Sequence, residues 1–254
     1  MTPSTDTTLT SRPHAERPPR AAATLVVVRD ALAGSAGTGI EVLLSRRAER
    51  GDHFSGAWVF PGGVVDAGDR AAHSCCTGLD DAAASARLGV PEGGLDYYVA
   101  ALRECFEESG LLYATNRDGA TVRFEGSAQL DSQAQPCVAA WRGPLHRGER
   151  TLGALCAEFS LQLAADQLIY LSHWLTPPAH QKRFDTRFFL AVAPAGQTSA
   201  HDGTELVEQL WLRPADALVR AVELKLVTPT EKTLELLARF DRVATLLAWA
   251  RAPR

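Results

Sequence analysis

Runs of branched and aliphatic residues, separated by glycine- and proline-rich breaks, predict most of the strands in this chain. Residues 23–30 and 40–47 are two such runs with a glycine-rich segment between them, which is typical of a strand pair. Residues 57–65 predict a short strand that ends at a Pro-Gly-Gly sequence. Further strands are expected over residues 168–177, 183–194 and 204–212.

Helical segments alternate irregularly with these strands. A short helix is expected over 80–90, followed by a helix over 96–110 with Asp96 as its cap and Ser109-Gly110 as its end. Other helical segments are expected over residues 135–150, 152–163, 214–224 and 226–254. Irregular alternation favours a mixed α/β sandwich over a regular doubly wound sheet.

The helix expected over 96–110 has two different faces. One face is mostly apolar, because its residues follow the 3.6-residue period of a helix: Val99, Leu102, Phe106, Ser109 and Tyr113. The opposite face collects three carboxylates, at Glu104, Glu107 and Glu108. The helix is therefore expected to bury one side and to gather negative charge on the other.

Such a cluster of like charges has two interpretations. Like charges four residues apart destabilise a helix by a few tenths of a kcal/mol, and the one cation within the motif is Arg103. A divalent cation such as Mg²⁺, which prefers oxygen ligands, would compensate the charge. A solvated acidic face is the other interpretation, and the helix alone leaves both open.

Composition narrows the class of protein. The chain has 254 residues and a net charge of −4, so its overall charge gives no argument for a nucleic-acid or membrane partner. We expect a disordered tail over residues 1–20 and one elaborated domain over 21–254. The five cysteines form no CxxC pair and no secretory signal is recognised, which favours reduced thiols in the cytoplasm.

The acidic helix and the glycines before it resemble the signature of the Nudix hydrolases. The sequence "RECFEESGL" fits the second half of that signature, with Cys105 where an aliphatic residue is usual. In the first half, five residues follow Gly63 and lead to Asp69, where the family has Glu. Thirty-three residues then precede Arg103 instead of seven, so the signature is split by an insertion over about 70–95.

The resemblance implies a Nudix-like α/β/α sandwich around a mixed sheet, and a pyrophosphohydrolase that uses Mg²⁺ or Mn²⁺. It implies that the metal ligands are Glu104, Glu107, Glu108 and the Gly63 carbonyl. Arg103 would orient Glu104 by an ion pair. A further carboxylate could come from Asp69, Glu205 or Glu208.

A second stretch points to one branch of this family. Residues 43–63 resemble the motif that precedes the Nudix signature in coenzyme A diphosphatases, although Asp52 stands where that motif has Arg. Together with the insertion, residues 175–191 look most like the acyl-CoA diphosphatase branch. The resemblance implies a small-molecule diphosphate as substrate, with Arg47, Arg50 and Arg183 as candidates to bind its phosphates. It leaves a homodimer open.

Three alternatives remain at this point. The substrate could instead be ADP-ribose, NADH or a nucleotide sugar. The domain could bind a nucleotide as a sensor without hydrolysing it. The acidic helix could be purely structural, in which case divalent ions would not stabilise the protein.

Overall fold

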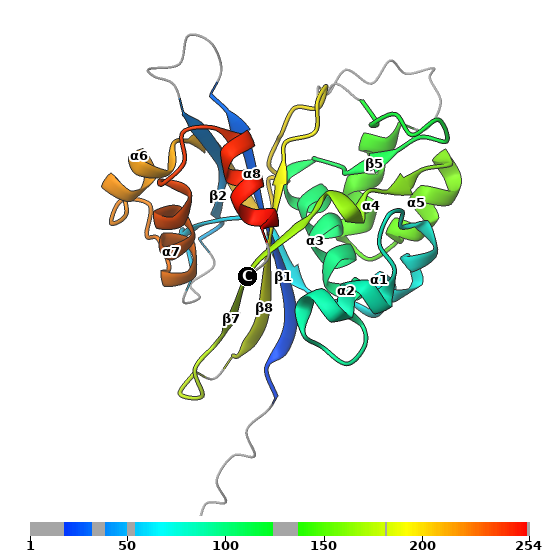
Figure 1. Ribbon diagram of the computed structural model, residues 1–254, viewed down its shortest axis with the longest axis horizontal. Helices are drawn as coiled ribbons and strands as arrows, with labels where there is room; N and C mark the ends of the chain where they lie inside the picture. Colours follow the sequence, from blue (N-terminus) through cyan, green and yellow to red (C-terminus); the bar gives the residue numbers. More distant parts are fainter. Residues whose placement is uncertain (1–17, 32–38, 50–53, 124–136, 181, 253–254) are drawn as a thin grey trace, which may run out of the picture.

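The computed structural model describes residues 18–31, 39–49, 54–123, 137–180 and 182–252. One mixed sheet runs through the centre, and helices cover both of its faces (Figure 1). The two faces carry separate hydrophobic cores, one beneath α1–α5 and the other beneath α6–α8. The expected α/β/α sandwich is therefore confirmed.

The sheet is built around its first strand, β1 (Arg20–Asp30). β1 runs parallel to β8 (Phe184–Val192), and its other edge pairs antiparallel with β2 (Ile40–Arg47) and with β4 (Gly62–Val64). β2 also pairs with β3 (Trp58–Val59) and β9 (Leu206–Leu212), while β7 (Ile169–Leu175) lies beside β8. The strand expected over 57–65 is thus two short strands, β3 and β4.

The helices divide into two layers (Figure 1). One layer holds α1 (Ala67–Ala71), α2 (Asp81–Leu88), α3 (Gly94–Ser109), α4 (Arg142–His146) and α5 (Leu152–Phe159). The other holds α6 (Pro214–Val219), α7 (Thr228–Leu237) and α8 (Val243–Arg251). The segment expected to be helical over 135–150 contributes a 3-10 turn, Val138–Trp141, followed by the short helix α4. A small separate ladder joins β5 (Ala114–Thr115) to β6 (Gln162–Leu163).

Strand periodicity decides which residues of the sheet meet α3. Leu25, Val27 and Leu43 point into the core beneath α3, whereas their neighbours Val26 and Leu44 point into the core beneath α7 and α8. This alternation is the normal consequence of a strand whose successive side chains face opposite sides. Both faces are apolar because both are covered by helices.

The segment between the two halves of the Nudix-like signature folds into compact helices. It contains the end of α1, a 3-10 turn at His73–Cys75 and α2, and α2 packs against α3. The carboxylate of Asp81 accepts hydrogen bonds from the backbone N–H groups of Gly93 (3.0 Å) and Leu95 (2.9 Å). The insertion therefore supplies the cap for the start of α3.

This arrangement corrects the expectation that Asp96 caps the helix. The cap position is Gly93, and Asp96 lies inside the first turn, where it pairs with Arg70 at 3.1 Å and with His73 at 2.7 Å. Two residues of α2 satisfy the N–H groups at the start of α3, Asp81 at Gly93 and Leu95 and Ser85 Oγ at Gly94 (2.9 Å), so a local cap is not needed.

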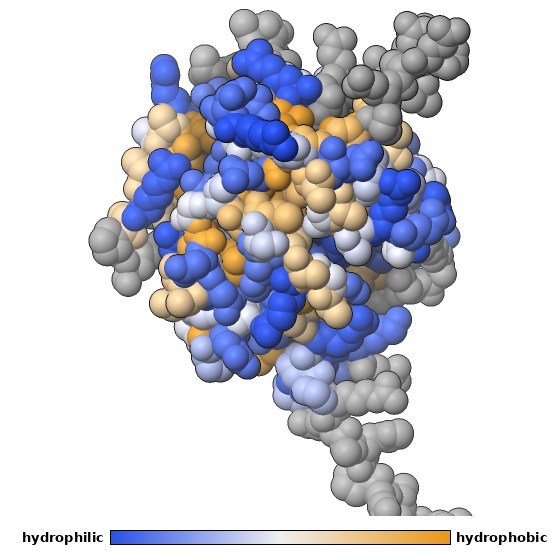
Figure 2. Space-filling view, turned by 90° about the vertical axis from the view of Figure 1, so that its right-hand side faces the viewer, coloured by the Kyte–Doolittle hydropathy of each residue, from blue (hydrophilic) through white to orange (hydrophobic). Residues whose placement is uncertain are grey.

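The predicted tail, residues 1–20, lies mostly outside the described residues. Its last residue, Arg20, begins β1, and its N–H donates to the Arg183 carbonyl at 2.9 Å. The strand expected from residue 23 thus starts three residues earlier, at Arg20. Figure 2 shows the face on the side of α1–α5, where polar side chains surround an apolar area near the middle. Among the described residues, no helix combines the length and the apolar character that a membrane span requires.

Candidate active site

The helix α3 carries the motif as predicted. Its apolar stripe is buried, and the helix ends at Gly110, whose φ of 74° is in the left-handed region that favours glycine. The acidic side is not a solvated face, because Glu107 and Glu108 are only 5% and 2% exposed. The interpretation of an acidic surface in water is therefore wrong, and the buried carboxylates need another source of stabilisation.

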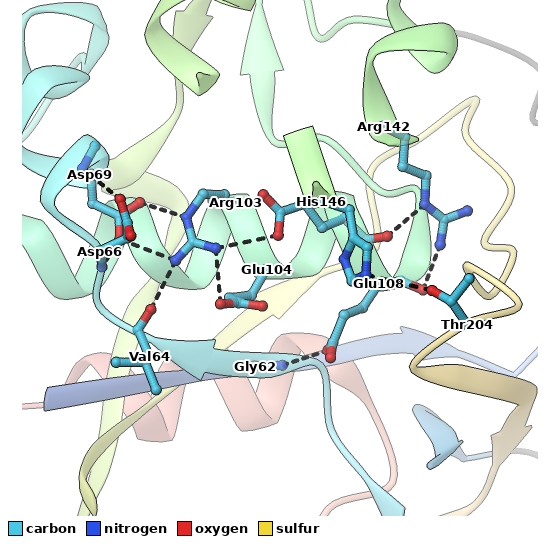
Figure 3. Close-up of polar contacts among 12 residues, drawn as sticks. Gly62, Val64, Asp66, Asp69, Arg103, Glu104, Glu108, Arg142, His146 and Thr204 are labelled. Carbon is cyan, nitrogen blue, oxygen red and sulfur yellow. Dashed lines mark hydrogen bonds and ion pairs between the residues drawn. The ribbon is translucent and has the colours of Figure 1, made fainter. Parts of the chain in front are cut away.

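Arg103 provides part of that stabilisation (Figure 3). Its Nη1 donates to Glu104 Oε1 at 2.9 Å and to Glu107 Oε2 at 3.3 Å. Its Nη2 donates to the Val64 carbonyl at 2.9 Å, which ties α3 to the sheet. One guanidinium therefore orients two of the three carboxylates, whereas the resemblance implied a pair with Glu104 alone.

Asp69 binds the other edge of the same guanidinium. Its two carboxylate oxygens accept from Arg103 Nε at 2.7 Å and from Nη2 at 3.1 Å, and its side chain is 0% exposed. Asp69 Oδ2 also accepts from the N–H of Asp66 at 2.7 Å, as part of a capping box on α1. The shorter Asp thus reaches Arg103, and it lies outside the set of carboxylates on α3.

The two glycines of β4 lie against the carboxylates of Glu108 and Glu104. The N–H of Gly62 donates to Glu108 Oε2 at 2.8 Å. At Gly63, an added Cβ would lie only 2.2 Å from Glu104 Oε1, so the Glu104 carboxylate rests directly on this backbone. The Pro-Gly-Gly sequence therefore forms the floor beneath the acidic side of α3, and no residue with a side chain fits at Gly63 without moving Glu104.

The carboxylates disturb one another's ionisation. Burial raises the pKa of Glu107 to about 7, with Arg103 opposing and Glu104 adding to the rise. Burial also raises the pKa of Glu104, and it raises that of Glu108 well above its ordinary value; Glu205 adds to both. A buried anionic cluster that retains unfavourable charge after pairing with Arg103 would gain free energy from another cation.

The two later carboxylates lie on different sides of the sheet. The charge of Glu205 acts on both Glu104 and Glu108, which places it beside the cluster. Glu208 instead pairs with Arg46 at 2.9 Å and has a side chain 48% exposed. Its neighbour Leu210 packs into the core beneath α6–α8, on the face opposite α3. Of the two, only Glu205 lies beside the acidic helix.

The three arginines expected to bind phosphate have different positions. Arg47, at the end of β2, lies close enough to Glu108 to lower its pKa. Arg50 lies outside the described residues. Arg183 donates from Nε to the Thr176 carbonyl at 3.2 Å, beyond the start of β8. It lies four positions along the sheet from the level of Gly63, about 13 Å at the rise of a strand, and so does not join the cluster.

A residue that the sequence analysis did not identify, Arg142, binds the end of α3 (Figure 3). Its Nε donates to the Glu107 carbonyl at 2.7 Å, and its Nη2 donates to the Glu108 carbonyl at 2.5 Å. Nη1 reaches the His201 carbonyl at 3.3 Å. The local sequence does not predict this role, because Arg142 belongs to a separate helix, α4, and its three hydrogen bonds described above are to backbone carbonyls.

A small cavity of about 210 Å³ lies beside the cluster. Its lining includes Glu107, Arg142, His146, Asp202 and Thr204. His146 Nε2 lies 3.5 Å from Thr204 Oγ1. A larger cavity of about 660 Å³ lies elsewhere, with Tyr98 and Arg251 among its lining residues, and no carboxylate of the motif lines it.

The donor set fits a hard divalent cation in its chemistry. It offers anionic oxygens only, they repel one another, and they share one face of one helix. Within the described residues, no three acidic, histidine or cysteine side chains yet converge as a formed metal site. Arg103 holds Glu104 and Glu107 in this arrangement, and the Gly62 N–H holds Glu108.

Known proteins resemble this chain in sequence. The chain is 26% identical over 223 residues to the acyl-coenzyme A diphosphatase NUDT19 of Xenopus laevis, and 27% identical over 238 residues to that of Homo sapiens. These matches cover 77% and 82% of this chain, but only 58% and 63% of the relatives. The chain thus spans about three fifths of the length of these curated relatives.

A solved structure gives the same result for the fold. The Nudix hydrolase from Alicyclobacillus acidocaldarius superimposes with a TM-score of 0.73 at 28% identity, covering 92% of this chain and 97% of that one. The family model described as the NUDT19 Nudix domain matches residues 77–236, which include α3, α4 and β9. With most of its length in that match and the acidic helix in place, the chain belongs to the NUDT19 Nudix domain family.

Proposed function

We propose that this protein is a divalent-metal-dependent pyrophosphohydrolase that acts on coenzyme A or an acyl-CoA. The observation that carries the proposal is the set of three glutamates on α3, of which Glu107 and Glu108 are buried and Glu104 is 14% exposed, held by Arg103 and by Gly62. A structural helix has no need to withdraw three carboxylates from water and so raise their pKa values. The NUDT19 relatives, which are named acyl-coenzyme A diphosphatases, support the substrate class.

In this proposal Glu104, Glu107 and Glu108 hold Mg²⁺ or Mn²⁺ together with the Gly63 carbonyl. When bound, such an ion would neutralise charge on a diphosphate and lower the pKa of a bound water. The oxygen of water attacks one phosphorus, the bridging P–O bond breaks, and the products are two phosphomonoesters. The protein's own contribution is to place the charges before substrate arrives.

The roles of the individual residues follow from their contacts. Arg103 fixes the directions of Glu104 and Glu107, and Asp69 fixes Arg103 in turn. Arg47 is the cation of β2 nearest the cluster, and it is suited to bind a phosphate of the substrate. Glu205 is placed to add a fourth carboxylate to the site.

A substrate panel tests the proposal. Coenzyme A, an acyl-CoA, ADP-ribose, NADH, a nucleotide sugar and a diadenosine polyphosphate are each incubated with Mg²⁺ or Mn²⁺, and the products are identified by mass. We expect coenzyme A or its thioester to give the highest kcat/KM. Preference for ADP-ribose or a nucleotide sugar would assign the other branch, and binding without hydrolysis would indicate a sensor.

Two isosteric variants test the site itself. Glu107→Gln and Glu108→Gln remove charge while keeping shape, so we expect a folded protein with turnover reduced by several orders of magnitude. Glu208→Gln is the matched control, because Glu208 is a glutamate on the opposite face of the sheet. Activity close to wild type in both α3 variants would contradict the mechanism. Cytoplasmic location and a homodimer stay predictions.

A further inference from the structure

Arg142 binds two backbone carbonyls in the last turn of α3. Gly110 already closes α3, since its N–H donates to the Phe106 carbonyl at 2.9 Å. The Ser109 carbonyl accepts from the N–H of Ala200 at 2.9 Å. The fork of Arg142 binds the Glu107 and Glu108 carbonyls, and the Glu108 carbonyl also accepts from Gln209 Nε2 at 3.3 Å. These two backbone groups belong to two of the proposed metal ligands.

The same guanidinium also reaches the loop that carries Glu205. Its Nη1 donates to the His201 carbonyl, one residue before Asp202. The Asp202 carboxylate in turn accepts from the backbone N–H groups of Glu205 at 2.6 Å and Leu206 at 3.0 Å. Arg142 thus connects the part of α3 that bears Glu107 and Glu108 to the turn that presents Glu205.

A half-buried arginine in this position carries a desolvation cost. Burial lowers the pKa of Arg142, and the negative charges of Asp202 and Glu108 oppose this. No ion pair between Arg142 and a carboxylate is among its described contacts, which are to three backbone carbonyls. A cation near a helix C-terminus is favourable, but a surface residue would serve that purpose without the cost of desolvation.

We propose that Arg142 is a positioning residue, which sets the placement of Glu107, Glu108 and Glu205 relative to one another by fixing the backbone that bears them. The inference rests on the proposed function, because it assigns Arg142 to the same site. The planar fork of an arginine can fix two neighbouring carbonyls at once, whereas the point charge of a lysine cannot. Residues that orient metal ligands from outside typically contribute about 10- to 100-fold in metal affinity or activity.

The test compares Arg142→Ala and Arg142→Lys with Arg220→Ala in the full chain. Arg220 is the matched control, because it makes a comparable forked contact, to Glu223 at 2.9 and 2.6 Å, on the exposed surface. We measure kcat and KM on the best substrate of the panel, and Mn²⁺ affinity by the electron paramagnetic resonance signal of the free ion. The second measurement needs no turnover.

For Arg142→Ala we expect a loss of about 10- to 100-fold in kcat or in Mn²⁺ affinity, with KM changed much less. Guanidinium added well below denaturing concentration should restore part of the loss, and Arg142→Lys should lie between Ala and wild type. A merely structural role would lower the melting temperature without changing kcat per folded molecule. If Arg142→Ala does not fold, the Lys variant decides in the same way.

Three outcomes overturn the inference: a folded Arg142 variant with wild-type kcat and Mn²⁺ affinity, an equal loss in Arg220→Ala, or no rescue by guanidinium together with an unimpaired Lys variant. The failure of the proposed function looks different. In that case the wild-type protein hydrolyses no diphosphate of the panel, and the Mn²⁺ titration of the Arg142 variants still decides whether Arg142 positions the carboxylates.

Discussion

Gly63 offers the sharpest test of the site, because adding one methyl group should damage activity far more than stability. In Gly63→Ala the new Cβ would lie 2.2 Å from Glu104 Oε1, whereas real Cβ atoms essentially never approach closer than 3.0 Å. The carboxylate must therefore move by about 0.8 Å. The φ of Gly63 is not in the positive range, so the alanine backbone itself is not strained.

The magnitudes follow from what has to move. The obstacle is the end of a side chain, so the fold can adapt by losing the bond from Arg103 Nη1 to Glu104, about 1.5 kcal/mol at the low end for a bond between charged groups. A displacement near 1 Å at a catalytic group costs about 100-fold in rate, or about 2.7 kcal/mol of transition-state stabilisation. We expect kcat to fall by about two orders of magnitude while the melting temperature falls by only a few degrees.

Substitutions of two other glycines, Gly62 and Gly153, separate this effect from a general loss of stability. In Gly62→Ala the new Cβ would lie 2.4 Å from the Ala23 carbonyl oxygen and 2.7 Å from the Thr24 Cα, and backbone cannot move without breaking the β1–β4 pairing. That variant should lose stability as well as activity. Gly153 lies within helix α5, and a Cβ added there would come no closer than 3.7 Å to its nearest neighbour, the Cα of Ala72. For Gly153→Ala, stability should therefore be unchanged or rise by up to about 1 kcal/mol.

The assay combines kcat at saturating Mn²⁺, the Mn²⁺ concentration for half-maximal activity, and thermal unfolding of each variant. Wild-type kcat in a folded Gly63→Ala protein would refute the placement of Glu104 against this backbone. A loss that matches the unfolded fraction would refute it as well, because the methyl group would then be acting on the fold instead of the site.

Three further predictions concern the carboxylates. Glu205→Gln should weaken Mn²⁺ affinity or kcat while Glu208→Gln changes neither, as measured by titration and steady-state kinetics; equal effects would contradict the separation of the two residues by the sheet. Mn²⁺ at about 100 times its Kd should stabilise the wild-type protein by about 2.7 kcal/mol in a thermal melt, and the absence of any shift would argue for a purely structural acidic helix. Asp69→Asn should lower the free energy of unfolding by about 1.5 to 3 kcal/mol, since it weakens a charge-assisted contact with Arg103, while Asp69→Glu should retain most of it; urea unfolding measures both.

Much of the acidic helix could be predicted from its sequence because helix geometry is local. The period of 3.6 residues fixes which side chains share a face, and it placed Glu104, Glu107 and Glu108 opposite the apolar stripe. The end at Gly110 is equally local, since glycine adopts the left-handed conformation at little cost. The acidity of the face could be predicted, but its burial could not.

Burial and pairing depend on elements that come from far along the chain. Arg103 binds Asp69, which lies on the other side of the insertion in sequence. Glu108 accepts from the N–H of Gly62 in β4, and its own carbonyl accepts from Arg142 in α4. The start of α3 is capped by Asp81 of the insertion, so the local expectation of Asp96 was wrong. Local patterns carry no information about which distant groups satisfy a helix end.

The sequence by itself determined that one helix would bear an arginine and three glutamates on a common face, because that follows from spacing along a single element. The tertiary structure alone decided that Glu205 and not Glu208 lies beside them, and that Arg183 lies too far along the sheet to join them. The physical reason for the position of Glu208 is strand register. A shift of one residue moves a side chain to the other face of a sheet, and that register is set by packing across the whole fold.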